Sequence, residues 1–403
     1  MVLSDVFEAI ERQKMKLESD DFEIEREMLS ELPKLDNHAL VVSGIRRGGK
    51  STILKQFVRK SGEDFFFLNF EDVKFSQFSF QDYELLDIAI KESGHKILFF
   101  DEIQNAEKWE LYVRQKLDEK YRVVITGSNS SLLSKELGTK LTGRHIQKEL
   151  FPFSYSEFLK LKSLENNTEN FSQYLFNGGF PEYIKTGNSD IVAQLVSDIL
   201  YKDIAVRYGI RNVQALKQLF VYIASNAANF LSPSKLISVC QVKSPATVLE
   251  YISYLETSYL VCTIPTFSYS LKSQSLLPKK VYLSDNGIIN VASLSFSKNL
   301  GALLENIVFV HFRRQENNDI YCFNDGTNEC DFVINPNSAP YCVQVCYEMT
   351  VDNKNREIDG LFAAMNFFKT DKGIIITLNQ KDIIIKDGKK VEVVPANEFL
   401  LGN

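Results

Sequence analysis

The sequence lacks the features of a secreted or membrane-spanning protein. Its six cysteines stand singly, without a CxxC pair, which favours a reducing compartment over disulfides. For Cys322, Cys330, Cys342 and Cys346, the missing CxxC spacing favours buried apolar thiols over a four-thiolate zinc site. The first residues, MVLSDVFEAIERQK, contain no basic segment followed by an apolar one, so they do not form a signal peptide. The longest apolar stretch, 219–231, is interrupted by Ser225, Asn226 and Asn229 and is shorter than the roughly 20 residues of a membrane span. We therefore predict a cytoplasmic protein that does not enter the membrane.

The chain also has little net charge and no internal repeat or low-complexity linker. Its 403 residues carry 46 basic and 52 acidic side chains, a formal net charge of −6, and 44% of the residues are hydrophobic. Most of the negative charge lies in residues 1–34, which hold ten acidic and five basic side chains. This composition excludes wholesale disorder, and at about 100–200 residues per domain the length predicts two to four domains. Because the rest of the chain is nearly neutral, charge alone argues neither for nor against nucleic-acid binding.

From residue 39 onward, short apolar strands alternate with helices. We predict strands at 39–44, 64–70, 96–102, 122–128 and 145–151, and helices at 51–60, 81–92 and 107–120. Continuous apolar strands joined by helices indicate a parallel sheet that is covered on both faces. The predicted fold class is therefore α/β. The residues before this part are predicted to form acidic helices over 4–31, broken near 19–21.

After Phe151-Pro152 this alternation stops and helical patterns dominate. We predict a helical lid over 154–208. Three helices at 213–228, 232–240 and 244–256 are then followed by a strand at 259–264, an order typical of a winged helix-turn-helix. The remaining predicted elements are helices at 301–314 and 356–368 and strands at 320–323, 330–334, 341–347 and 373–378.

The segment Gly44-Ile-Arg-Arg-Gly-Gly-Lys50-Ser51 matches the phosphate-loop pattern GxxxxGK[ST] and lies between a predicted strand and a predicted helix. Glycines let consecutive backbone N–H groups surround phosphates, and the N-terminus of the following helix adds partial positive charge. Lys50 would reach the β- and γ-phosphates of ATP, and Ser51 would bind Mg²⁺. The predicted ATP-binding residues are Gly44, Arg47, Gly48, Gly49, Lys50, Ser51 and Thr52.

Two acidic residues, Asp101 and Glu102, follow the apolar strand residues Ile97-Leu-Phe-Phe. They lie at the carboxyl end of a predicted strand, where α/β sheets bind their ligands. Asp101 would hold Mg²⁺ through water, and Glu102 would orient or deprotonate the attacking water. The strand at 64–70 comes between the phosphate loop and this pair. Together with the glutamate, it favours the additional-strand class of ATPases over small GTPases.

Two further side chains are candidates for accessory catalytic roles. Asn129, with Ser128 as the alternative, follows the strand at 122–128 and could sense the γ-phosphate or position water, or only cap the next loop. Arg144 precedes the strand at 145–151 and could act as an arginine finger, within its own chain or across a subunit boundary. The alternative for Arg144 is a solvated surface residue.

Five segments together resemble a known family: GIRRGGKST, ILFFDEIQ, ITGSNSSLL, LTGRHIQKELFPFSYSEF and NGGFPEYI. They are similar to segments of bacterial and archaeal AAA-type ATPases that carry a C-terminal domain resembling PD-(D/E)xK nucleases. The resemblance implies Mg²⁺-dependent ATP hydrolysis, an arginine-finger role for Arg144 and a winged-helix segment. The predicted domains are thus 1–35 (acidic helices), 36–152 (phosphate-loop ATPase core), 153–208 (helical lid), 209–270 (winged helix-turn-helix) and 271–403 (nuclease-like domain).

The resemblance also implies a nuclease-like site of the form E…D…(E/D)-x-K in the last domain. Its positions fall on Glu305, Asp331, Gln344 and Cys346. In such nucleases two carboxylates bind Mg²⁺, and the lysine activates water or stabilises the oxyanion. Gln344 offers only a neutral carbonyl oxygen, and Cys346 cannot supply an ammonium. We therefore predict a degenerate module that binds a partner or nucleic acid, with an active metal-dependent nuclease as the alternative.

The leading functional hypothesis is an AAA-like ATPase whose nucleotide state rearranges the other domains. The alternative is a nucleotide-gated scaffold with little turnover that acts through a protein partner. The helix at 244–256 contains no Lys or Arg, which argues against reading DNA bases. Non-specific DNA contact, a protein partner and a homo-oligomer are all compatible with the sequence.

Overall fold

The computed structural model divides the chain into two compact units. It describes residues 1–19, 23–34, 37–129, 141, 143–294, 299–315 and 319–402. The first unit consists of Met1–Phe151 with Thr257–Tyr259, and the second consists of Pro152–Glu256 with Leu260–Asn403. Among the described residues, no helix is both long enough and apolar enough to cross a membrane.

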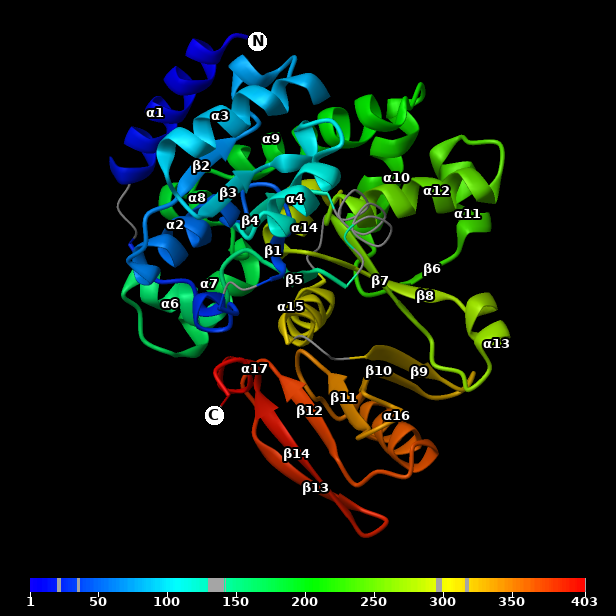
Figure 1. Cartoon of the computed structure of the whole chain (residues 1–403). Coiled ribbons are helices and arrows are strands. Elements are labelled where there is room, and N and C mark those ends of the chain that lie inside the picture. The colour runs from blue at the N-terminus through cyan, green and yellow to red at the C-terminus, as the bar shows by residue number, and fades with distance from the viewer. Residues whose placement is uncertain are drawn as a thin grey trace. The chain divides into compact units, whose positions relative to one another are not determined.

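A five-stranded parallel sheet forms the centre of the first unit (Figure 1). Its strands are β1 (Ala39–Ser43), β2 (Phe66–Asn69), β3 (Ile97–Asp101), β4 (Arg122–Gly127) and β5 (His145–Glu149). Their order in the sheet is β2-β3-β4-β1-β5, and all neighbours are parallel. The predicted parallel sheet is therefore confirmed. However, the strand that lies between β1 and β3 is β4, whereas the strand predicted at 64–70 forms the sheet edge as β2.

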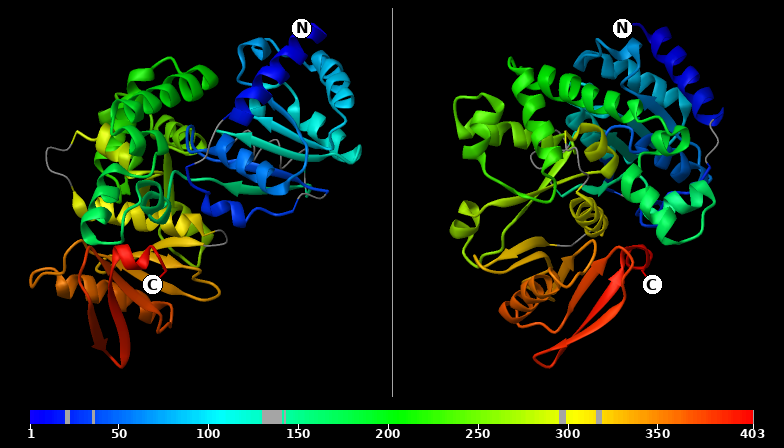
Figure 2. Two further views of the ribbon diagram at one scale, coloured as in Figure 1. Left: turned by 90° about the vertical axis from the view of Figure 1, so that its left-hand side faces the viewer. Right: turned by 180° about the vertical axis from the view of Figure 1, so that it is seen from behind.

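Helices cover both faces of this sheet (Figure 2) because both faces of its strands are apolar. They are α1 (Leu3–Ser19), α2 (Lys50–Ser61), α3 (Tyr83–Ser93) and α4 (Trp109–Asp118). Successive strand residues point to opposite faces. Ala39 and Val41 of β1 pack in a core with α1, α3 and α4. Leu40 and Val42 pack in a second core with α2 and the turn Glu27–Ser30.

The N-terminal segment differs from its prediction. Only α1 is an α-helix, and the second predicted helix is reduced to the 3₁₀ turn Glu27–Ser30. The reason is that the backbone before this turn bonds to α2: Gln56 accepts from the Arg26 N–H at 2.9 Å and donates to the Ile24 carbonyl at 2.7 Å. Since Val6 and Ala9 of α1 are also fully buried in the first core, α1 and the turn Glu27–Ser30 belong to the first unit rather than preceding it.

The first part of the second unit is helical, as predicted. It contains α6 (Tyr155–Lys162), α7 (Thr168–Asn177), α8 (Pro181–Thr186), α9 (Asp190–Asp198), a π-helix (Ile199–Val206), α10 (Val213–Ser225), α11 (Pro233–Cys240) and α12 (Pro245–Thr257). A three-stranded antiparallel sheet of β6 (Phe230–Leu231), β8 (Lys279–Leu283) and β7 (Val261–Pro265) follows in the order β6-β8-β7. The sequence missed β6, β8, α13 (Leu271–Leu276) and α14 (Asn286–Ala292). This sheet extends across the predicted boundary at 270/271, because β8 pairs with β7.

A six-stranded mixed sheet ends the chain. Its strands are β9 (Ile320–Asn324), β10 (Glu329–Ile334), β11 (Tyr341–Val345), β12 (Gly373–Thr377), β13 (Asp382–Lys386) and β14 (Lys389–Pro395), in the order β13-β14-β12-β11-β10-β9. β11, β12 and β14 run parallel, and the outer pairs are antiparallel. Helix α16 (Lys354–Phe367) packs on one face through Leu361 and Met365. The predicted α15 (Leu300–Arg314) is present, while β13, β14 and α17 (Ala396–Phe399) were not predicted.

A buried carboxylate fixes the turn Gly178-Gly179 of the second unit. Asp285 accepts hydrogen bonds from the N–H groups of Gly179 at 2.6 Å and Gly287 at 2.8 Å. A Cβ at Gly178 would lie 2.0 Å from the Asp285 carboxylate, which explains the glycine there.

We expect Asp285→Ala to lower the free energy of unfolding by about 2–4 kcal/mol, because two buried N–H groups lose their acceptor. Urea denaturation of wild type and variant measures this loss. Asp285→Asn keeps one acceptor and should lose less. Equal midpoints for Asp285→Ala and wild type would show that these bonds do not stabilise the unit.

Candidate functional site

The phosphate loop connects β1 to α2, and its glycines are required by the backbone. Gly49, at the N-cap of α2, has a φ of 102°, and a Cβ there would lie 2.6 Å from the Arg26 guanidinium. Gly44 has a φ of 139°, and a Cβ there would lie 2.1 Å from the Leu150 carbonyl oxygen. These conformations are open to glycine and strained for other residues. Arg26, which the sequence did not single out, also donates to the Gly48 carbonyl at 2.9 Å and so braces the loop.

The lysine of the loop is buried within it. Lys50 Nζ donates to the carbonyl oxygens of Gly44 at 3.2 Å and Ile45 at 3.3 Å. It also forms an ion pair with Glu102 Oε1 at 3.3 Å. The structure therefore brings the predicted phosphate-binding lysine and the predicted catalytic glutamate into direct contact. Of the other predicted loop residues, Arg47 is exposed and Thr52 is half-buried in the first turn of α2.

The two predicted Mg²⁺ ligands also lie together. Asp101 Oδ2 accepts from Ser51 Oγ at 2.8 Å and from Asn69 Nδ2 at 3.0 Å, and Oδ1 accepts from Thr126 Oγ1 at 2.5 Å. Burial and the charge of Glu102 raise the pKa of Asp101. The Asp101 carboxylate and the Ser51 hydroxyl lie within hydrogen-bond distance of each other, and both are oxygen ligands of the kind that Mg²⁺ takes in ATPases. These residues therefore fit the ion that the fold implies.

Glu102 is held in a defined position by its backbone and its side chain. Its φ is 50°, and its N–H donates to Thr126 Oγ1 at 2.9 Å. Its Oε2 accepts from Gln104 Nε2 at 2.5 Å and from Ser128 Oγ at 3.1 Å. Burial alone would raise the pKa of Glu102, but the Lys50 ammonium and these hydrogen bonds lower it. The carboxyl is therefore ionised at neutral pH and can accept a proton.

Ser128 and Asn129 lie at the carboxyl end of β4, which runs between β1 and β3. Both side chains are buried, and Ser128, the alternative candidate, contacts Glu102 directly. Gln104 was not predicted, although it belongs to the quoted segment ILFFDEIQ. Its Oε1 is buried and accepts no hydrogen bond from the part of the chain that the structure describes.

Arg144 lies at the amino ends of the strands, whereas the phosphate loop lies at their carboxyl ends. Its carbonyl accepts from the N–H of Ala39, the first residue of β1, whereas the loop follows Ser43, the last. At about 3.3 Å per residue, the length of β1 separates the two positions. The guanidinium pairs with Asp118 at 2.5 Å. This placement does not fit an arginine finger at its own phosphate loop, and the role across a subunit boundary stays a prediction.

A cavity of about 620 Å³ opens onto Ser51 and Asp101. Basic side chains line it from three segments: Arg12 and Lys16 of α1, Arg46 of the phosphate loop and Lys55 of α2. The N-terminal helix thus contributes positive charge beside Ser51 and Asp101, even though its segment is acidic in composition.

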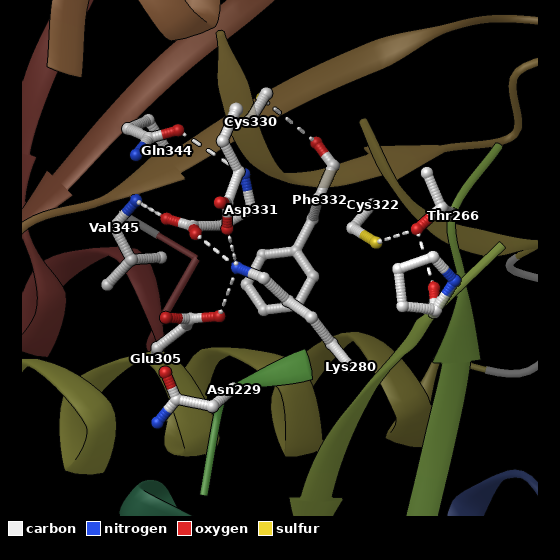
Figure 3. Close-up of polar contacts among 12 residues, drawn as sticks. Asn229, Thr266, Lys280, Glu305, Cys322, Cys330, Asp331, Phe332, Gln344 and Val345 are labelled. Atoms are coloured by element: carbon white, nitrogen blue, oxygen red, sulfur yellow. Dashed lines mark hydrogen bonds and ion pairs between the residues drawn. The ribbon is translucent and has the colours of Figure 1, made fainter. Parts of the chain in front are cut away.

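Three of the four predicted nuclease-like positions also meet, in the second unit (Figure 3). Asp331 of β10 accepts from the Val345 N–H of β11 at 2.9 Å, and Gln344 Oε1 accepts from the Asp331 N–H at 3.3 Å. Lys280 Nζ, from β8, lies 2.8 Å from Asp331 Oδ1 and 3.2 Å from Glu305 Oε1 of α15. Cys346 points elsewhere, since its Sγ donates to the Glu348 carbonyl at 3.2 Å.

These residues do not fit the Mg²⁺ ion that the nuclease resemblance implies. The Lys280 ammonium lies where the carboxylates converge, and the Gln344 amide nitrogen donates to Glu357 at 2.6 Å. Among the described residues, no group of three or more His, Cys, Asp or Glu side chains could hold a metal ion. The prediction that Cys322, Cys330, Cys342 and Cys346 are buried thiols is confirmed.

A parallel sheet of this strand order, with a phosphate loop and an acidic pair at its carboxyl ends, defines a P-loop NTPase-like domain. Residues 36–159 match the model of an AAA domain, AAA_14. Residues 168–299 and 300–399 match two domains of unknown function, DUF8612 and DUF4143, neither of which names a nuclease.

Three relatives of similar length match the chain. It is 34% identical to "Uncharacterized protein MJ1544" of Methanocaldococcus jannaschii, over 91% of this chain and 88% of that protein. It is 30% identical to an "Uncharacterized protein" of Haemophilus influenzae, over 90% of this chain and 94% of that protein. It is 21% identical to "Uncharacterized protein MJ1637" of Methanocaldococcus jannaschii, over 88% of this chain and 84% of that protein. The chain therefore belongs to the family of MJ1544 and the Haemophilus influenzae protein, and its N-terminal domain is an AAA domain.

Proposed function

We propose that the protein is a Mg²⁺-dependent ATPase. The single observation that carries this proposal is the contact of Lys50 with Glu102, beside the contact of Ser51 with Asp101, at the carboxyl edge of the AAA sheet. The backbone of Gly44–Ser51 and Lys50 would hold the phosphates, and Ser51 and Asp101 would hold Mg²⁺. When bound, the ion neutralises charge that develops on the β- and γ-phosphate oxygens.

Glu102 would accept the proton of the attacking water. To bind phosphate, the Lys50 ammonium must leave Glu102 Oε1, 3.3 Å away, which frees that oxygen for water. Glu102 Oε2 meanwhile stays fixed by Gln104 and Ser128.

Asn129 would face the γ-phosphate from the carboxyl end of β4. Arg144 would stabilise transition-state charge only from a neighbouring subunit, so the proposal includes a homo-oligomer.

Gln104 is a positioning residue in this scheme, because it bonds to Glu102 rather than to substrate. We expect Gln104→Leu to lower kcat about tenfold with KM near wild type, and to shift the acidic limb of the pH–rate profile upward. The reason is that Glu102 loses a donor that favours its ionised form. Steady-state phosphate release between pH 5 and 9 measures both effects. Gln115→Leu is the matched control, because the Gln115 amide donates to Glu119 on the exposed side of α4.

For the second unit we propose a module that binds rather than cuts. Three helices with the antiparallel sheet β6-β8-β7 support a winged helix-turn-helix. The six-stranded sheet with α15 and α16 supports a degenerate PD-(D/E)xK-like domain. ATP turnover would change how these domains bind a protein partner or non-specific DNA, and we place the protein in the cytoplasm.

Steady-state phosphate release by the full chain tests the proposal. We expect release that requires Mg²⁺ and stops when EDTA is in excess. The measurement is repeated with and without duplex DNA. Binding of ATP with no release under any of these conditions would instead support a nucleotide-gated scaffold, the alternative suggested by a helix at 244–256 without Lys or Arg and by Gln344 and Cys346 in the nuclease-like positions.

A further inference from the structure

Three carboxylates from two elements of the second unit converge on one buried ammonium. Figure 3 shows two of them, Glu305 and Asp331, with Lys280 between them. Lys280 Nζ lies 2.5 Å from Glu329, 2.8 Å from Asp331 and 3.2 Å from Glu305. The Lys280 side chain is 3% exposed, whereas Glu329 is 42% exposed. The cluster is therefore closed around the lysine and reaches solvent through Glu329.

Two of the carboxylates, those of Glu305 and Asp331, are also fixed from outside the ion cluster. Tyr282, two residues after Lys280 on β8, donates to Glu305 Oε1 at 2.7 Å. The Val345 N–H donates to Asp331 Oδ2 at 2.9 Å. The oxygens of Glu305 and Asp331 are thus held in place by groups that would remain if the ammonium were removed.

Electrostatics agree with this geometry. Burial would lower the pKa of Lys280, but the charges of Asp331 and Glu305 raise it well above its ordinary value. Burial and the charge of Asp331 raise the pKa of Glu305 to about 8. The Lys280 ammonium therefore stays charged at neutral pH, and it is the counter-charge of whichever carboxyl groups are ionised beside it.

We propose that Lys280 is the built-in cation of this cluster and takes the place of a divalent metal ion. Ca²⁺ binds carboxylate oxygens at about 2.3–2.6 Å in flexible geometry. Oxygens that lie 2.5–3.2 Å from one nitrogen need only a small contraction to reach those distances. Removing the ammonium converts the cluster into a divalent-cation site. It follows that the intact second unit folds without a metal ion at this cluster. It also follows that the cluster holds no metal ion that could activate water for cleavage of nucleic acid.

This inference rests on the second unit alone and not on ATP hydrolysis, so either can fail without the other. The experiment is calorimetric titration of Ca²⁺ into the full chain without nucleotide, paired with thermal unfolding in Ca²⁺ or EDTA. Wild type should bind no Ca²⁺ that depends on Asp331. Lys280→Ala should gain one site per chain and an unfolding midpoint that rises with Ca²⁺.

The controls separate this site from any other. The double variant Lys280→Ala/Asp331→Asn should lose the new site, while Lys279→Ala, on the exposed neighbour, should behave as wild type. If Lys280→Ala does not fold in EDTA, we expect Ca²⁺ to restore folding. The proposal is overturned if Lys280→Ala gains no Ca²⁺ site and no Ca²⁺-dependent folding, or if wild type binds Ca²⁺ at a site that Asp331→Asn removes.

Discussion

Glu102→Gln is expected to lower ATP turnover by about 10²–10⁴-fold while ATP still binds. The amide keeps the size of the side chain and can still contact Gln104 and Ser128, but it cannot accept the proton of the attacking water. Affinity for ATP should be unchanged or a few-fold tighter, because Lys50 loses the carboxylate that now pairs with it. Phosphate release and equilibrium binding of a fluorescent ATP analogue measure the two effects.

Glu107→Gln is the matched control for this variant. Glu107 lies five residues further on, is 58% exposed and pairs with Lys108, so its replacement should leave turnover at the wild-type rate. Turnover by Glu102→Gln within twofold of wild type would show that another group accepts the proton.

Lys50→Ala is expected to weaken ATP binding by at least about 100-fold. A buried ammonium that bonds to phosphate oxygens makes charge-assisted hydrogen bonds, and its loss also leaves the buried Glu102 without a counter-ion beside the phosphates. Titration with Mg²⁺·ATP measures the loss of affinity. Lys60→Ala, in the last turn of α2 and 57% exposed, should bind ATP as wild type does.

Because Lys50→Ala also removes a contact within the protein, its folding must be checked separately. Thermal unfolding in the absence of nucleotide serves this purpose. A folded Lys50→Ala variant that binds ATP with wild-type affinity would contradict the assignment of Gly44–Ser51 as the phosphate site.

The AAA core could be predicted from the sequence because its signals are local. Apolar runs such as Ile97-Leu-Phe-Phe predict buried strands. The phosphate-loop pattern predicts a strand directly before it and a helix directly after it. The order of strands in the sheet is not local. For that reason the position of β4 between β1 and β3 emerged only from the structure. The position of Arg144 at the amino end of β5, away from the phosphate loop, follows from its place before a strand of a parallel sheet.

The cluster around Lys280 shows why the second site was only partly predicted. Glu305 and Asp331 follow from the family resemblance, but a lysine is rarely fully buried, so KKVYL was not read as a strand. Lys280 and Tyr282 are two residues apart and therefore lie on the same face of β8. This spacing was the one signal in the sequence that could have predicted their position beside each other. Their partners come from segments at least 20 residues away, a pairing that no local pattern specifies.

A single-turnover experiment tests the proposed ATPase activity most directly. Protein in excess over ATP, with Mg²⁺ present, reveals one round of hydrolysis even where steady-state release is slow. We expect wild type to convert its bound ATP to ADP and phosphate, and Glu102→Gln to retain the ATP intact over the same time. If wild type keeps its bound ATP unhydrolysed, or if both proteins hydrolyse it equally fast, the proposal that Glu102 drives ATP hydrolysis at this site is wrong.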